Sequence, residues 1–342
     1  MASLKIAFVG AGHIARLHAQ NVAALPDVEV RGFCDLNAER AAGLAREFRG
    51  AEAFTSATEL YDAIRPDAAY VCVTPDAHGV IEIEAARRGI HLFIEKPQCI
   101  DADVGRRVEA AVREAGILAS IGYQNRYRRS VERARELLAL EPPILALGHW
   151  IGHTYRVPWW SDKRVSGGQL VEQSTHTVDL IRHLVGEPVE VYGRAARGFV
   201  KDLPEYHNDD ASAVTFTMPS GCVATVLSCC ANVPGYGVGL KIFTRSLTLD
   251  FTGWEHSLAV RKSALESENV KGEENIFAKE DAAFVDAIRA NDVSKLRCTY
   301  ADGLKTALLT LAATEALDSG RTMRLDAGEP PPEALRAQAA GG

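Results

Sequence analysis

The sequence predicts an α/β protein in which a doubly wound parallel sheet is followed by an α+β unit with a large, open, mostly antiparallel sheet. Three observations predict this class. Short apolar runs alternate with helical patterns through the first third of the 342 residues, and a glycine-rich turn follows the first of these runs. After Gly122, strand-like runs follow one another without helices between them. The length favours about two domains, which we place at residues 1–122 and 123–328.

The first unit begins with an apolar strand at residues 4–9. Further strands are expected at residues 28–34, 69–73, 91–94 and 117–121, with helices at residues 14–25, 38–48, 59–64, 81–88 and 103–115. Nearly continuous apolar strands that alternate with helices are typical of a parallel sheet covered on both faces.

The second unit is richer in strands. We expect them at residues 144–151, 189–195, 211–218, 222–229, 240–243 and 246–251, with helices at residues 129–140, around His176, and at residues 278–290 and 300–319. The segment Pro219-Ser-Gly221 has the composition of a hairpin turn. The Pro-rich, then Ala/Gly-rich residues 329–342 are predicted to be a disordered tail.

Composition excludes several classes of function. The formal net charge of −7 and the absence of a clustered basic stripe argue against a nucleic-acid partner. The seven cysteines lack paired spacing, which argues against a zinc ribbon and suits a reducing, cytoplasmic location. There is no apolar run of about 18 residues, so no membrane span is expected.

The segment Gly10-Ala-Gly12-His13-Ile14-Ala15 has the G-x-G-x-x-A spacing of a dinucleotide-binding turn, between a strand and a helix. The first glycine permits a tight turn, and the second lets the backbone approach a pyrophosphate. The start of the helix favours the phosphates. We therefore expect Gly10, Gly12, His13 and Ile14 to contact the cofactor.

Asp35 ends the second strand, near the expected offset of about 20 residues from the glycine turn. A carboxylate there accepts hydrogen bonds from the adenosine ribose and repels a 2′-phosphate, so it favours NAD over NADP. Arg40 lies further along and is placed to reach such a phosphate. The alternative is that Asp35 caps the following helix, and both roles are compatible.

The sequence resembles the Gfo/Idh/MocA oxidoreductases, the family of glucose–fructose oxidoreductase and inositol dehydrogenase. The residues that carry the resemblance are residues 10–18, Thr74-Pro75-Asp76-Ala-His78, Glu95-Lys96-Pro97, residues 167–176 followed by Asp179, Asp209-Asp210 and residues 284–288. The spacing of Glu172, His176 and Asp179 is specific when it follows Glu-Lys-Pro and a glycine turn. The resemblance implies a Rossmann domain and a second domain whose open sheet forms a homodimer or homotetramer.

Lys96 is the first candidate for acid–base chemistry, which is worth about 10²–10⁴-fold in rate. It follows an apolar strand, at the carboxyl edge where ligands bind in open α/β sheets. Partial burial and a neighbouring cation would lower the pKa of its ammonium. The resemblance implies that Lys96 contacts the reacting hydroxyl and that the peptide bond before Pro97 is unusual. The alternative is a surface lysine with a packed stem.

His176 is the second candidate, because an imidazole exchanges protons near neutral pH. Glu172 and Asp179 lie four residues before and three after it, on one face if a single helix contains all three. Glu172, where the family more often has Asp, is then expected to orient His176 or bind a substrate hydroxyl, and Asp179 to bind another. The alternative is a structural, hydrogen-bonded histidine.

The remaining cofactor contacts are implied by the resemblance. Thr74 and Pro75 are expected in a loop above the ribose and nicotinamide, where the family has Asn in place of Asp76. Glu95, Lys96 and His78 are counted with the cofactor site, although His78 also has the character of a local structural histidine.

Tyr123, Asn125 and Arg126 are expected to line the substrate cleft, with a salt-bridged linker arginine as the alternative for Arg126. Trp159 and Trp160, together with Trp150 and Tyr155, are either a stacking platform for sugar rings or part of a core or oligomer interface. Residues 152–166 are predicted to cover the cleft.

We expect no metal. His149, His153, Glu172 and His176 include zinc-type ligands, but the family's dehydrogenases work without metal. The sequence thus predicts an NAD-dependent oxidoreductase acting on a secondary alcohol of a sugar, inositol or sugar derivative, with Lys96 and His176 as acid–base groups. One alternative is a redox-neutral enzyme that cleaves glycosides or epimerises with recycled NAD. Another is a non-catalytic sugar sensor, which would need no base.

Overall fold

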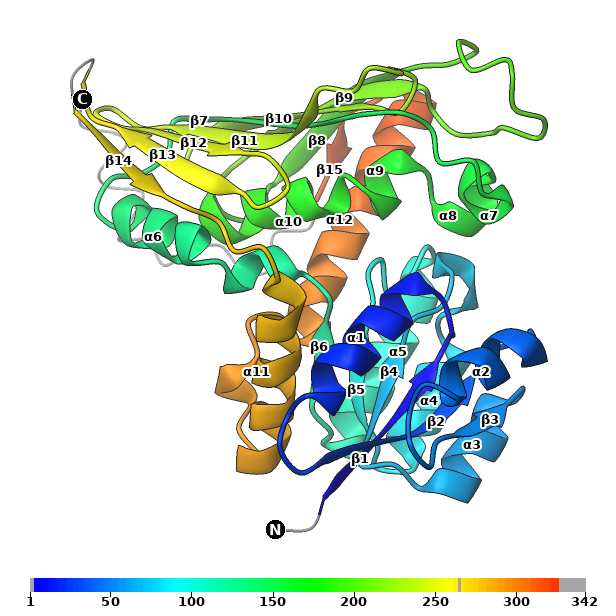
Figure 1. Ribbon diagram of the computed structural model, residues 1–342. Helices are drawn as coiled ribbons and strands as arrows, with labels where there is room; N and C mark the ends of the chain where they lie inside the picture. The colour runs from blue at the N-terminus through cyan, green and yellow to red at the C-terminus, as the bar shows by residue number, and fades with distance from the viewer. Residues whose placement is uncertain (1–2, 264–265, 326–342) are drawn as a thin grey trace.

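The computed structural model describes residues 3–263 and 266–325. It contains two sheets, one in each of two stacked units (Figure 1). The lower unit in Figure 1 is a parallel sheet flanked by helices, and the upper unit is a broad sheet with helices on the side that faces the lower unit. The fold class predicted from the sequence is confirmed.

The first sheet has six parallel strands in the order β3-β2-β1-β4-β5-β6. The strands are β1 (Leu4–Val9), β2 (Val28–Cys34), β3 (Glu52–Phe54), β4 (Ala68–Val71), β5 (His91–Ile94) and β6 (Ala119–Ile121). They alternate with α1 (His13–Ala23), α2 (Ala38–Ala45), α3 (Ala57–Ile64), α4 (Val80–Arg87) and α5 (Ala102–Ala115). The strand order reverses between β1 and β4, and ligands of such sheets bind beside this point at the carboxyl edge.

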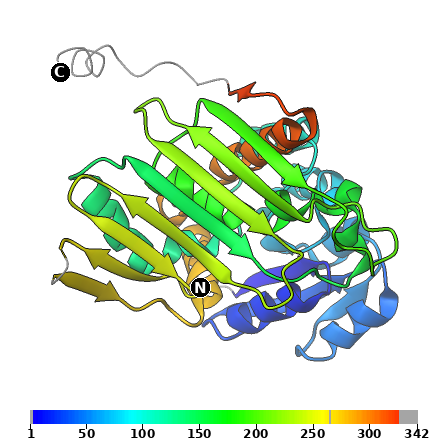
Figure 2. The same cartoon turned by 90° about the horizontal axis from the view of Figure 1, so that it is seen from above.

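The second sheet has nine strands in the order β14-β13-β12-β11-β7-β10-β9-β8-β15, and only β7 and β10 run parallel among these neighbours. The strands are β7 (Leu145–Ile151), β8 (Glu190–Ala196), β9 (Ala211–Thr217), β10 (Val223–Cys229), β11 (Gly237–Phe243), β12 (Thr248–Thr252), β13 (Ser257–Arg261), β14 (Ser267–Val270) and β15 (Met323–Arg324). Helices α6 (Arg129–Leu138), α10 (Thr175–Leu184) and α12 (Tyr300–Ser319) cover one face. The other face is open, as Figure 2 shows from above.

The chain returns to the first unit after completing most of the second sheet. Helix α11 (Ile276–Ala290) buries Phe284 and Val285 in the same core as Phe8 of β1. Helix α12 contributes Leu304 to the core that contains Ile121 of β6. Because both helices pack against the first sheet, the two units share a continuous interface.

Short elements complete the structure: the 3₁₀ turns η1 (Pro75–Ala77), η2 (Gln124–Tyr127) and η3 (Val293–Lys295), and the helices α7 (Pro158–Ser161), α8 (Lys163–Ser166) and α9 (Gln169–Glu172). Strands β3, β13, β14 and β15 were not anticipated from the sequence. The predicted tail, residues 329–342, lies outside the described residues, and the division at residue 122 stays a prediction. Across the described part of the chain, no helix has the length and apolar character needed to cross a membrane.

Candidate active site

The glycine turn lies at the carboxyl end of β1. Gly10 has φ of 94°, and a Cβ there would lie 2.1 Å from the carbonyl oxygen of Cys72, so the tight turn requires glycine. A Cβ added to Gly12 would meet no described atom within 4 Å, so the chain faces open space there. Helix α1 begins at His13, and the amides of its first turn are available to an anion. This arrangement fits the pyrophosphate of a dinucleotide.

The side chain of Asp35 bonds to the backbone of the glycine turn and does not cap the next helix. Its Oδ2 accepts a hydrogen bond from the amide of Ala11 at 3.0 Å, and its Oδ1 accepts one from the amide of Asn37 at 2.8 Å. The N-cap of α2 is Asn37, which accepts from the amides of Glu39 and Arg40. The capping alternative for Asp35 is therefore wrong. The guanidinium of Arg40 lies 3.5 Å from its Oδ1.

The loop after β4 carries Thr74, Pro75 and His78 at the same carboxyl edge. Thr74 donates its hydroxyl to Asp76 Oδ1 at 2.6 Å. His78 is buried, and its Nδ1 lies 2.5 Å from Glu82 Oε1 at the start of α4. This contact gives His78 the local structural role that the sequence also suggested, while a cofactor contact stays a prediction.

Lys96 follows β5 and enters a cis peptide bond with Pro97. Its Nζ donates to Glu172 Oε1 at 2.8 Å and to the Glu172 carbonyl oxygen at 2.9 Å. Burial lowers the pKa of Lys96, but the negative charges of Glu172 and Glu95 outweigh burial and raise it. The expectation of a neighbouring cation that lowers this pKa is wrong, because the neighbours are carboxylates. Lys96 is therefore a stable ammonium in this arrangement.

Glu172 links Lys96 to the segment 152–166. Its second oxygen, Oε2, accepts a hydrogen bond from Nε1 of Trp160 at 2.9 Å, and the Trp160 side chain is fully buried. Helix α9 ends at Glu172, and α10 begins at Thr175. The condition for a shared face, a single helix through Glu172, His176 and Asp179, is thus not met. The break lets Glu172 pair with Lys96, whereas only His176 and Asp179 share α10.

His176 is buried but has an unused polar atom. It is 4% exposed, and its Nδ1 has no hydrogen-bond partner within residues 3–263 and 266–325. Its ring stacks on Trp150 with centroids 5.8 Å apart and meets the edge of Tyr123 at 6.1 Å. Burial, together with the charge of Lys96, holds the pKa of His176 well below its usual value. Buried polar atoms are normally satisfied, so the unpartnered Nδ1 singles out His176 as a candidate for contact with a ligand.

Arg126, Asp179 and Asn125 form internal contacts. Arg126 donates to both oxygens of Asp179 at 2.8 and 2.6 Å, and Asp179 also accepts from the Thr306 hydroxyl at 2.8 Å. Asn125 Oδ1 accepts from Arg128 Nε at 2.7 Å. These contacts join η2, α10 and α12, and they favour the linker interpretation of Arg126 over a substrate contact.

Tyr123 supports the start of α10. Its hydroxyl lies 2.8 Å from Thr175 Oγ1, and its ring is the one that meets His176 edge-on. Tyr123 is therefore positioned to hold the imidazole, and its predicted contact with substrate stays a prediction.

The aromatic cluster divides into core and surface. Trp160 is buried, whereas Trp159 and Tyr155 are 36% and 47% exposed. Trp150 is half-buried, and the edge of Trp254 meets it at a centroid distance of 5.9 Å. Trp160 thus packs inside, as one of the two alternatives predicted, while stacking of sugar rings on the partly exposed Trp159 and Tyr155 stays a prediction.

The sequence analysis missed Trp254, His256 and Arg128. His256 is buried and contacts the Trp254 carbonyl through Nδ1 at 3.0 Å, and burial lowers its pKa to about 4. Arg128 has no exposed surface and donates to the same carbonyl at 3.0 Å, and burial lowers its pKa to about 10. These side chains come from separate turns and form no motif, so no signal in the sequence marks them.

The four residues considered as zinc ligands, His149, His153, Glu172 and His176, do not form a metal site in the structure. His149 lies against Tyr236 with ring centroids 5.0 Å apart, and Glu172 is paired with Lys96. Among the described residues, no group of three or more His, Cys, Asp or Glu side chains is arranged to hold a metal ion.

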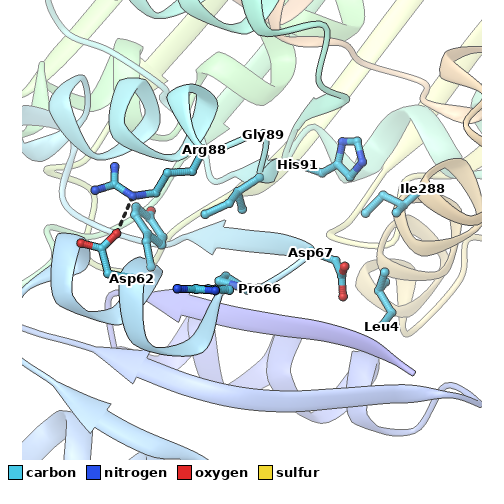
Figure 3. A pocket seen from close by; sticks show the side chains of 11 residues that line it. Leu4, Asp62, Pro66, Asp67, Arg88, Gly89, His91 and Ile288 are labelled. Atoms are coloured by element: carbon cyan, nitrogen blue, oxygen red, sulfur yellow. Dashed lines mark hydrogen bonds and ion pairs between the residues drawn. The ribbon is translucent and has the colours of Figure 1, made fainter. Parts of the chain in front are cut away.

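A cavity of about 620 Å³ lies at the opposite edge of the first sheet. Leu4 at the start of β1, Asp67 before β4 and His91 at the start of β5 line it, and Asp62 pairs with Arg88 along its wall at 2.9 Å (Figure 3). This is the amino edge of the strands, whereas the glycine turn and Lys96 lie at the carboxyl edge. The cavity is therefore separate from the candidate active site.

Both units match models of known families. Residues 4–123 match the model described as "Oxidoreductase family, NAD-binding Rossmann fold", and residues 145–250 match "GFO/IDH/MocA C-terminal domain". Among curated relatives, the uncharacterized oxidoreductase YrbE of Bacillus subtilis is 24% identical over 332 residues, which cover 93% of this chain and 95% of the relative. Myo-inositol 2-dehydrogenase of Thermotoga maritima is 23% identical over 338 residues, with 94% and 99% coverage.

Solved structures share the fold. The WlbA dehydrogenase from Bordetella pertussis, in complex with NADH and UDP-GlcNAcA, superposes with a TM-score of 0.81 at 20% identity and covers 95% of this chain and 100% of that one. UDP-N-acetylglucosamine 3-dehydrogenase GnnA from Acidithiobacillus ferrooxidans gives 0.80 at 23% identity, with 93% and 99% coverage. Taken with the glycine turn and the open second sheet, the matches to both units show that this chain is a member of the Gfo/Idh/MocA family of oxidoreductases.

Proposed function

We propose that the protein oxidises a secondary alcohol of a sugar, inositol or sugar derivative with NAD, and that Lys96 and His176 are its acid–base groups. One observation carries the proposal. The ammonium of Lys96, at the carboxyl edge that also bears the glycine turn, is near enough for its charge to lower the pKa of His176, a buried imidazole whose Nδ1 has no described partner. Relatives named as inositol dehydrogenases support the substrate class.

NAD, when bound, supplies the acceptor for the hydride. The amides of Gly12, His13 and Ile14 would hold its pyrophosphate, and Asp35 its adenosine ribose. The loop of Thr74 and Pro75 would flank the nicotinamide half. The open space at Gly12 and the Asp35 carboxylate beside the turn fit this assignment.

The two acid–base groups have different tasks. His176 is neutral because its pKa is lowered, so it is able to accept the hydroxyl proton of the substrate. Lys96 stays an ammonium because its pKa is raised, so it acts as a donor that stabilises the developing alkoxide. Glu172 holds the ammonium in place through its 2.8 Å contact.

A redox-neutral reaction with recycled NAD is the second candidate. It would use the same base and the same cofactor site. A relative named 2,7-anhydro-N-acetylneuraminate hydratase, from Escherichia coli, is 27% identical over 200 residues, which cover 56% of this chain. Product formation without net NADH distinguishes this reaction from a dehydrogenase.

We also propose that the protein is cytoplasmic and forms a homo-oligomer. All seven cysteines are free, which supports a cytoplasmic location. The open face of the second sheet exposes Leu147 at 43%, Leu227 at 45% and Tyr192 at 42%. Apolar side chains on a sheet face that no helix covers support a homodimer or homotetramer formed through this face.

Substitution of the acid–base groups tests the main proposal. Lys96→Met and His176→Asn are each expected to lower kcat by about 10²–10⁴-fold, because each removes one partner in proton transfer or alkoxide stabilisation. The measurement is NADH absorbance with a panel of sugars and inositols. Lys271→Gln, at a lysine whose side chain is 80% exposed, is the matched control. Full activity in either variant would contradict the assignment.

The pH profile tests the division of tasks. His176 loses its base form only as pH falls through its lowered pKa, well below 6.5. Lys96 loses its charge only as pH rises through its raised pKa, above 10.5. We therefore expect kcat/KM for alcohol oxidation to be nearly constant from about pH 7 to pH 10. If kcat/KM of the wild type changed steeply between about pH 7 and pH 10, and this change were missing in His176→Asn, His176 would titrate in that range and the proposed division of tasks would be contradicted.

Asp35 tests the cofactor preference. In Asp35→Ser, loss of the carboxylate removes repulsion of a 2′-phosphate and frees Arg40 to pair with it. The ratio of kcat/KM for NADP to that for NAD is expected to rise about tenfold or more. Asp35→Ser/Arg40→Gln is the control that should lose most of this gain. An unchanged ratio in the single variant would refute the role of Asp35.

Leu227→Arg tests the assembly. A charge in the middle of the exposed face of β10 is expected to disrupt a sheet-to-sheet interface, because an unpaired charge is costly to bury. The mass in solution, measured by light scattering, should fall toward that of a 37.0 kDa monomer. Leu140→Arg, at a residue that is 86% exposed beyond α6, is the control. A wild-type protein that is already monomeric would refute the proposal.

A further inference from the structure

His18 is a fully buried histidine that the proposed chemistry does not use. It lies on α1, two turns after the glycine turn. Its Nδ1 lies 2.7 Å from Asp281 Oδ1, and its Nε2 lies 3.1 Å from Glu95 Oε1. One side chain thus joins three elements: the cofactor helix α1, the turn after β5 and helix α11.

Contacts at both nitrogens indicate a charged ring. A neutral imidazole donates from only one nitrogen, whereas an imidazolium donates from both, and here each nitrogen faces a carboxylate. Burial lowers the pKa of His18, but Asp281 and Glu95 outweigh it and raise the pKa to about 10. The ring is also enclosed by aromatic neighbours, with Phe93 at 4.9 Å and Tyr70 at 5.5 Å between centroids. Two carboxylates and two aromatic rings therefore hold the charged ring of His18 in place.

The partners of His18 lead directly to Lys96. Glu95 accepts from His18 with one oxygen and from the backbone amide of Lys96, at 3.1 Å, with the other. A Cβ added to Gly122 would lie 2.8 Å from Glu95 Oε1, so the glycine leaves the space that this carboxylate occupies. Asp281 is held from the other side by Asn21 Nδ2 at 2.9 Å.

We propose that His18 is a positioning residue: its positive charge fixes Glu95, and through Glu95 the peptide of Lys96, relative to the glycine turn that begins α1. The glycine turn sets where the cofactor is anchored, and Lys96 acts at its reactive end. The charged ring of His18 belongs to α1 and contacts Glu95, which accepts from the Lys96 amide. These contacts fix the distance between the glycine turn and Lys96. The functional part of this proposal rests on the proposed role of Lys96.

Several acidic side chains surround His18, and the positive charge of His18 balances the negative charge of these buried carboxylates. Glu95, Asp281 and Glu280 all face it, and Tyr70 and Cys72 are the other titratable neighbours. Glu280 has no exposed surface, and neither of its oxygens has a described partner. Burial, with the charge of Glu95, raises the pKa of Glu280 well above its usual value and so favours its neutral form. Lys96 also places a positive charge near Glu95, but His18 is the cation that contacts both Glu95 and Asp281 directly.

The test compares His18→Gln with the wild type. We expect kcat to fall about 10–10²-fold, because small misplacements of catalytic groups have effects of this size, while KM for NAD changes by less than about threefold. A buried carboxylate without its cation takes up a proton more readily as pH falls. The kcat of His18→Gln should therefore decline from about pH 9 toward pH 6, whereas the wild-type value stays nearly constant.

Two variants separate positioning from packing. His91→Gln changes a histidine at the other end of β5, whose Nδ1 accepts from the Leu118 amide at 3.0 Å, and it should leave kcat and its pH profile unchanged. His18→Gln/Glu95→Gln removes the titrating carboxylate next to Lys96, so kcat should stay low with the new pH dependence diminished. A uniform, pH-independent loss in His18→Gln would show that His18 only packs, and would overturn the proposal.

The charge of His18 is measurable without activity. Nitrogen-15 NMR of the wild-type imidazoles at pH 8, with the His18 signal identified by its loss in His18→Gln or in His18→Asn, should show both nitrogens protonated. A neutral ring at pH 8 would overturn the proposal whether or not a substrate is found. Failure of the wild type to reduce NAD with any sugar or inositol, alongside a charged His18, would refute the proposed function alone.

Discussion

The ion pair between Lys96 and Glu172 joins the turn after β5 in the first unit to the end of α9 in the second, at 2.8 Å. Its two side chains are 15% and 11% exposed, so the pair is only weakly screened by solvent. Because the carboxylate raises the pKa of Lys96, it fixes which group is the cation and leaves His176 neutral beside it. The proposed division of acid–base tasks therefore rests on this contact between the units together with the burial of His176.

Local signals predicted the first unit well. The strands at residues 4–9, 28–34 and 91–94 have the bounds of β1, β2 and β5, because buried parallel strands read as short apolar runs. The glycine turn was found because its chemistry lies within six adjacent residues. Strand β3, with only three residues, two of them exposed, carries too little apolar pattern to be recognised.

The site itself depends on contacts that spacing does not reveal. Lys96 and Glu172 are 76 residues apart, and His18 and Asp281 are 263 apart. Glu172 and His176 have the spacing of a helix face, but the break between α9 and α10 turns them to different partners. Candidate residues could thus be named from the sequence, whereas their pairing and their charge states required the three-dimensional arrangement.

Through the hydrogen bond from Trp160, the one carboxylate of Glu172 holds both the segment 152–166 and the ammonium of Lys96. A shorter acid at position 172 would retract the oxygens by about 1.5 Å, the length of one carbon–carbon bond, and would have to release either the indole or the amine. The extra methylene of Glu and the indole of Trp160 are therefore matched to each other. Exchange of either residue alone therefore disturbs both the packing of residues 152–166 and the surroundings of the Lys96 ammonium.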